Sequence, residues 1–185
     1  MEKAHSLIKD HTKLSKGPFI ASGIPSQRIF IPMLFPSPNE YLRMATSSYA
    51  PGKKNQRSSG AQSLKTSMET KVQVHMRLAK LKPMEHAFFF FTFYELGRQR
   101  NKDNIMALAL KFFFDALQKA EIVANDGWKE IVAIDPHFEV TKESAGMLVR
   151  MYDPFQCEAE IIHEAFTNVR AKLDQYKDFR KRTGR

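Results

Sequence analysis

Residues 98–129, RQRNKDNIMALALKFFFDALQKAEIVANDGWK, decide how the rest of this chain is arranged. A basic loop leads into an apolar segment, and the turn-forming residues 125–128 follow it. The apolar segment repeats with helical spacing at Ile105, Leu108, Phe112 and Ala116, which places these side chains on one face. We therefore predict a helix that is capped by Asp103 or Asn104, ends near residue 120 and packs on a sheet.

The segment before this helix, residues 86–95, reads HAFFFFTFYE and lies between Pro83 and Gly97. Successive side chains of a strand point to opposite faces, so four consecutive Phe would put aromatic rings on both faces of a sheet. So many rings cannot all be exposed in a soluble protein, which favours a central strand covered on both sides. A platform of aromatic rings that stack on nucleic-acid bases is the alternative.

The remaining predicted elements surround that strand. Residues 28–31 begin a strand in which Pro32 marks either a sheet edge or the strand end, and the proline-rich residues 35–38 turn into residues 39–41. Apolar residues recur every three or four positions after Ser58 or Ser59, which predicts an amphipathic helix of about twenty residues, ended by Pro83. Residues 131–140 and 147–151 are predicted to be a pair of strands joined by a turn. This order of elements predicts an α/β (α+β) fold with a mixed sheet.

The predicted domain spans residues 27–153, with a flexible basic arm at 1–26 and a helical extension with a basic tail at 154–185. In the extension, apolar residues are spaced alternately by three and four positions, as in the a and d seam of a coiled coil. These residues are Ala159, Ile162, Phe166, Val169, Leu173 and Tyr176. The helix either forms a dimer or lies on its own domain, and we expect the basic tail, residues 180–185, to be disordered.

The charge of the chain is unevenly distributed. The 29 Lys and Arg outweigh the 20 Asp and Glu, and residues 1–82 hold 14 of the basic residues but only 4 of the acidic ones. A basic half of this kind favours a polyanionic partner, because Lys and Arg release counterions when they bind phosphate. The single cysteine, Cys157, excludes an internal disulfide framework and a cysteine-rich zinc site. No signal peptide and no apolar run of membrane-spanning length occurs, so we expect a cytoplasmic protein.

Two acids in the central stretch suggest chemistry. Asp103 stands in the loop and Asp126 in the turn, and acids at the same end of a sheet can share a Mg²⁺ ion, which accepts oxygen ligands. With basic neighbours, a carboxylate site of this kind suits metal-assisted hydrolysis of a phosphodiester. The alternative is structural, with Asp103 as a helix cap and Asp126 as a turn residue.

Taken together, these residues resemble the RusA-type Holliday junction resolvases, a family of dimeric endodeoxyribonucleases of bacteria and phages. Asp103-Asn104-Ile105 is similar to the second half of the family's acidic loop, Lys111 through Leu117 to its lysine and Asp-Ala-Leu, and residues 125–128 to its acidic turn. Residues 35–41 resemble the family's proline-rich strand end followed by Asn. The likeness spans about Ile29 to Met151.

The resemblance implies a cytoplasmic homodimer, in a bacterial or phage-infected cell, that binds four-way or other branched DNA and resolves Holliday junctions by paired symmetric nicks. By the same resemblance Asp103, Asp126 and Asn101 bind Mg²⁺, with Mn²⁺ as a possible substitute, and Lys111 assists the two acids in catalysis. The expected DNA-binding residues are Asn39, Lys53, Lys54, Arg57, Arg98, Arg100, Lys102 and Lys129.

The sequence departs from the family pattern at two positions. Asn101 stands where the family usually has its first acid, and an amide oxygen can ligate Mg²⁺ but brings no charge. Lys111 follows Asp103 by eight residues, about four more than is common in the family, and Lys102 could substitute for it. The alternative function is therefore a junction-binding protein with weak or lost cleavage. For Lys111 the structural alternative is an i,i+4 ion pair with Asp115.

Overall fold

The computed structural model describes residues 26–47 and 59–183. The expected arm before Ser26 and the expected DNA-binding residues Lys53, Lys54 and Arg57 lie outside these residues. The elements in chain order are β1 (Ser26–Ile31), α2 (Pro38–Ser47), α3 (Ser59–Leu78), β2 (Ala87–Glu95), α4 (Lys102–Lys119), β3 (Ile131–Val140), β4 (Gly146–Tyr152) and α5 (Glu158–Thr183). Among them, no helix is long and apolar enough to cross a membrane.

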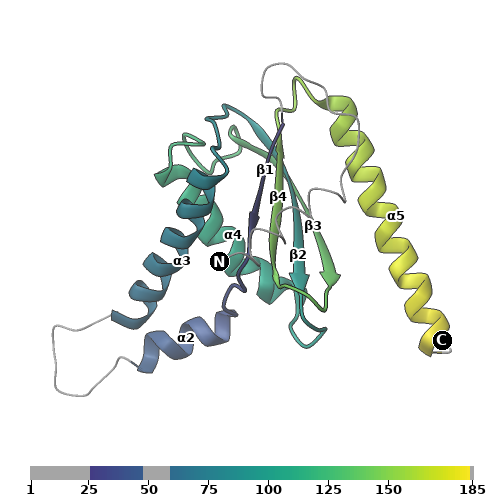
Figure 1. Ribbon diagram of the computed structural model, residues 1–185, viewed down its shortest axis with the longest axis horizontal. Coiled ribbons are helices and arrows are strands. Elements are labelled where there is room, and N and C mark those ends of the chain that lie inside the picture. Colours follow the sequence, from purple (N-terminus) through teal and green to yellow (C-terminus); the bar gives the residue numbers. More distant parts are fainter. Residues whose placement is uncertain (1–25, 48–58, 184–185) are drawn as a thin grey trace.

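The four strands form one mixed sheet in the order β1-β4-β2-β3 (Figure 1). β4 pairs antiparallel with both β1 and β2, whereas β2 and β3 are parallel. The predicted mixed sheet and the edge position of the first strand are confirmed. The predicted pairing of residues 131–140 with 147–151 is wrong, because β2 lies between β3 and β4. A short connection can join two strands without making them neighbours in the sheet.

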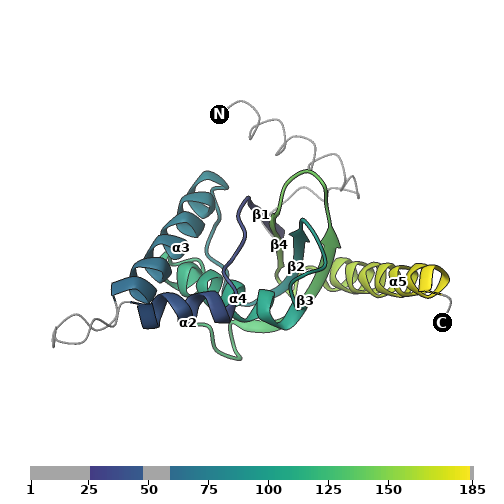
Figure 2. The ribbon, with the colours of Figure 1, turned by 90° about the horizontal axis from the view of Figure 1, so that it is seen from below.

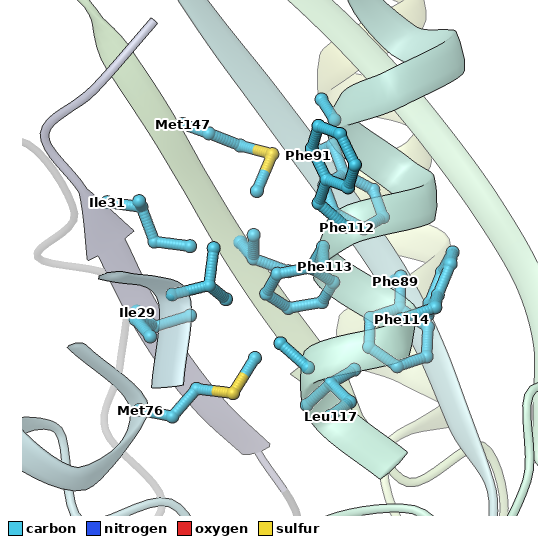
Figure 3. Packing of buried hydrophobic residues seen from close by; sticks show 14 of the residues in the cluster. Ile29, Ile31, Met76, Phe89, Phe91, Phe112, Phe113, Phe114, Leu117 and Met147 are labelled. Atoms are coloured by element: carbon cyan, nitrogen blue, oxygen red, sulfur yellow. The ribbon is translucent and has the colours of Figure 1, made fainter. Parts of the chain in front are cut away.

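The aromatic strand β2 is central, as predicted, and its rings are buried on both faces. Phe89 and Phe91 point toward α4, where both rings contact Phe113 edge to face at centroid distances of 6.2 and 5.4 Å (Figure 3). Phe90 points to the other face of the sheet and contacts the ring of Tyr152. Three consecutive Phe, residues 89–91, have no exposed surface at all. The rings therefore form the core and do not act as an exposed platform for bases.

Helices α3 and α4 cover one face of the sheet, and α5 lies on the opposite side (Figures 1 and 2). α3 has the predicted start and length, but it ends at Leu78, before Pro83. Lys80 adopts a positive φ of 54°, and Leu81 then donates its backbone N–H to the carbonyl oxygen of Met76. This left-handed residue ends the helix in the manner that glycine commonly does.

Helix α2 is an element that we did not predict, because residues 39–41 were expected to form only a turn. Its start has a capping box: Ser37 Oγ accepts the Glu40 N–H, and Glu40 Oε2 accepts the Ser37 N–H at 2.7 Å. Pro38 occupies the first helical position, where its missing N–H costs nothing. The Ser-Pro-Asn-Glu sequence is the signal from which this helix could have been predicted.

The chain after Pro154 forms α5, as predicted, but α5 continues to Thr183, so the expectation of disorder is wrong for residues 180–183. Cys157, just before α5, is a buried free thiol. Burial raises the pKa of this thiol, and the nearby Glu160 and Asp153 raise it further. Both effects keep the sulfur protonated, which suits a structural residue.

Candidate metal and DNA-binding site

The first turn of α4 holds an unpaired acid. Asn101 is the N-cap in extended conformation, yet no side-chain hydrogen bond caps the helix, so the predicted cap role of Asp103 or Asn104 is wrong. Asp103 lies in the first turn and is exposed, and none of the described residues forms a hydrogen bond or ion pair with it. The helix dipole stabilises an acid at this position. The Asp103 carboxylate and the Asn101 amide are thus both free to bind a ligand.

The second predicted acid, Asp126, lies beyond the other end of α4. Gln118, in the last turn of that helix, donates from Nε2 to Asp126 Oδ1 and to Asn125 Oδ1, both at 3.0 Å. The turn then connects to β3 through Ile131, which donates its N–H to the Gly127 carbonyl oxygen. Asp126 is exposed, and the turn is anchored on the C-terminal end of the helix.

The two acids are therefore far apart in one chain. Gln118 follows Asp103 by fifteen helical residues, which is roughly 22 Å at about 1.5 Å per residue. Ligands of one Mg²⁺ ion each lie only about 2 Å from it. The expectation that Asp103 and Asp126 lie at the same end of the sheet is wrong, and one chain cannot use both on one ion. No group of three His, Cys, Asp or Glu suited to a metal occurs within residues 26–47 and 59–183.

Lys111 lies about two turns from Asp103, roughly 12 Å along α4. Its Nζ is 4.0 Å from Asp115 Oδ2, so the i,i+4 pair is present at long range. Asp115 also pairs with Lys65 of α3 at 2.8 Å. Burial alone would raise the pKa of Asp115, but the hydrogen bond and charge of Lys65 outweigh it and lower the pKa. Asp115 therefore joins α3 to α4, and more than half of the Lys111 side chain remains exposed.

The loop between β2 and α4 is basic, but its arginines differ. Arg100 donates to both carboxylate oxygens of Glu95, at 3.1 and 3.3 Å, and to the carbonyl oxygen of Phe35 at 2.5 Å. Burial raises the pKa of Glu95, and Arg100 opposes that rise. Arg100 thus ties the end of β2 to the segment before α2, a structural role that the sequence did not reveal. We had predicted that it binds DNA, but its guanidinium is already engaged.

The other predicted DNA-binding residues that the structure describes are on the surface. Arg98 and Lys102 are exposed beside Asp103, and the Lys102 ammonium lies 5.3 Å from the centre of the Phe138 ring. Asn39 is exposed in the first turn of α2. Lys129 lies at the Asp126 end, where its Nζ is 3.5 Å from Glu85 Oε1. The basic residues therefore divide between the two ends of α4.

Trp128, next to Asp126, is 99% exposed, although it is the only tryptophan of the chain. Tryptophan is usually highly buried, and it is enriched at the centres of binding interfaces. Our sequence reasoning used this residue only as part of the turn. Its exposure leaves a large apolar side chain on the surface beside Asp126.

No known family model matches this chain, and a search of curated proteins finds no match.

Proposed function

We propose that this chain is a Mg²⁺-dependent, structure-selective endodeoxyribonuclease that acts as a homodimer and resolves four-way DNA junctions by paired nicks. The observation that carries the proposal is the free carboxylate of Asp103 at the start of α4, which follows the exposed Arg98 and Lys102 in the chain. An acid without a structural partner in a basic loop suits a hard cation that in turn binds phosphate. This support adds to the sequence likeness to RusA-type resolvases.

A twofold dimer can supply the second acid that one chain does not bring to Asp103. In an isologous dimer each contact occurs twice, and antiparallel α4 helices place the start of one beside the end of the other. Asp103 and Asn101 of one copy then face Asp126 of the second copy, and two equal sites result. When bound there, Mg²⁺ supplies an activated water and offsets charge on the scissile phosphate. Arg98 and Lys102 hold the phosphate backbone.

The charges and the exposed tryptophan support this arrangement. Arg98 and Lys102 are exposed at the start of α4, whereas the other end of α4 exposes the acids Glu121 and Asp126 together with Lys119 and Lys129. Antiparallel pairing places the two acids of each copy near Arg98 and Lys102 of the other, and opposite charges at these positions favour that register. Trp128 on the turn offers a large apolar anchor for the same contact.

The deciding experiment uses a synthetic four-way junction and a linear duplex of the same sequence, each with Mg²⁺. We expect nicks in the junction only, lost in Asp126→Asn. Asp178→Asn, an exposed acid on α5 far from the site, is the matched control and should cleave like wild type. A wild-type protein that leaves the junction intact, or an Asp126→Asn protein of full activity, ends the proposal.

The second candidate function is junction binding without cleavage, and Asn101 favours it because an amide adds no charge to a metal site. This candidate predicts tight, salt-sensitive binding of the junction by wild type, with no product in Mg²⁺ or Mn²⁺. Asn101→Asp should then gain nicking activity. Efficient cleavage by the wild-type protein excludes this candidate.

A further inference from the structure

Helix α5 meets the sheet through polar side chains. Glu164, Asn168 and Lys172 are four residues apart, so they share one face of the helix. Glu164 Oε1 pairs with Arg150 Nε and Glu164 Oε2 accepts from the Tyr152 hydroxyl, both at 2.6 Å, and Asp135 accepts from Asn168 at 3.0 Å and from Lys172 at 2.8 Å. A helix that docks on its own domain normally does so through its apolar stripe. In α5, by contrast, polar side chains make the contacts with the sheet.

The apolar seam of α5 faces away from these contacts. Its exposed fractions are 61% for Ile162, 68% for Phe166, 51% for Val169, 54% for Leu173 and 58% for Tyr176. The helix projects beside the body of the molecule (Figures 1 and 2), and the exposed fractions show that the described part of the chain leaves this seam uncovered. The sequence left two roles open for this helix: α5 does lie on its own domain, through Glu164, Asn168 and Lys172, while the described residues leave its apolar seam exposed. A contiguous row of large apolar side chains at this exposure indicates a binding surface.

The charges along the seam identify the occupant. His163, Arg170 and Lys177 follow each other at intervals of seven and form one edge of the seam, where Lys177 also pairs with Asp174 at 3.2 Å. If two copies paired through α5 in an antiparallel arrangement, the edge formed by His163, Arg170 and Lys177 would face the same edge of the second copy. A parallel arrangement would set Lys172 against Lys177, but Asp135 and Asp174 already pair with these lysines and reduce their repulsion. Like charges across a helix pair are unfavourable, so Arg170 disfavours an antiparallel second copy.

We propose that the α5 seam binds an amphipathic helix of another protein, in which acidic residues flank the apolar stripe. The facing acids would pair with the Arg170 edge while the apolar stripe covers Phe166 and Leu173, as in other helix-to-helix recognition. Five side chains that are more than half exposed offer on the order of 500 Å² of apolar surface, and a facing helix contributes a similar area. That total lies near the lower end of specific interfaces, which is typical of a reversible partner.

The test uses two fluorescently labelled 21-residue helical peptides with Leu at the a and d positions, one with Glu and the other with Lys at the e and g positions. Fluorescence anisotropy with the full-length protein should show micromolar binding of the Glu peptide and at least about tenfold weaker binding of the Lys peptide. Leu173→Ser should weaken binding of the Glu peptide about tenfold. Gln175→Ser, an exposed position of the same helix outside the seam, is the matched control and should bind like wild type.

Three outcomes overturn this inference: no binding of the Glu peptide, equal binding of both peptides, or unchanged binding by Leu173→Ser. A junction affinity that falls about tenfold in Leu173→Ser but not in Gln175→Ser also overturns it, because the seam would then belong to DNA. The last measurement is sedimentation velocity. Self-association that disappears in Leu173→Ser would assign the seam to a second copy of this chain. Junction nicking does not involve the seam, so these results stand apart from the nuclease assay.

Discussion

Mixing two inactive variants should restore nicking of a four-way junction. Asp103→Asn and Asp126→Asn each remove one acid from both sites of a symmetric dimer, so each variant alone should be inactive. In a mixed dimer one site has lost both acids, but the other combines the intact Asp103 of one copy with the intact Asp126 of the second. The prediction follows from the length of α4, which separates the two acids by roughly 22 Å within a chain.

The size of the recovery follows from counting sites. Random association of equal amounts gives about half mixed dimers, each with one intact site of two, so about a quarter of the wild-type sites return. The assay co-expresses the two variants with different affinity tags and follows cleavage of a cruciform plasmid in Mg²⁺. A mixed dimer can cut only one strand at the junction, so the product should be nicked circles, whereas wild type should give linear DNA.

The reciprocal mixture supplies the control. Wild type is combined with a variant that carries both Asp103→Asn and Asp126→Asn. If sites are shared between copies, each mixed dimer has one damaged acid in both sites and is inactive. If each chain builds its own site, the same dimer keeps one intact site. Active reciprocal dimers together with inactive Asp103→Asn and Asp126→Asn mixtures would refute the reasoning from the length of α4.

Further outcomes follow from the core, the capping box and the exposed tryptophan. Phe91→Ala should cost about 3–5 kcal/mol in urea unfolding, because the ring has no exposed surface and packs on Phe113; a loss under about 1 kcal/mol would contradict this packing. Glu40→Ala should cost about 1 kcal/mol at pH 7 by thermal unfolding. Hydrogen bonds from Ser37 lower the Glu40 pKa below 4.5, so the carboxylate stabilises the fold above that pH, and the difference between variants should vanish as the pH falls through the lowered value. Trp128→Ala should weaken the dimer at least about tenfold in sedimentation equilibrium, and an unchanged constant would remove Trp128 from the interface.

The elements of the fold that could be predicted are those whose burial is determined by local spacing. Four consecutive Phe can be hidden only in a central strand, and the three- and four-residue spacing of α3 allows one buried face. Helix α2 was missed because its ten residues are polar on average and its start follows two prolines. The neighbours of β3 were mistaken because the choice between pairing with β2 or β4 depends on tertiary packing, which a short connecting turn does not determine.

The prediction that Asp103 and Asp126 of one chain lie together was wrong, and the topology of the sheet explains why. β2 and β3 are parallel, so the loop after β2 lies at one end of the strands and the turn before β3 lies at the other end. Helix α4 runs between these two ends. Asp103 belongs to the first connection and Asp126 to the second. The residue types of the two acids suggested a metal site. Only the direction of the strands shows that the two acids lie far apart within one chain. In the proposed dimer each copy contributes Asp103 to one site and Asp126 to the other, and a twofold axis is the simplest operation that brings the two acids together.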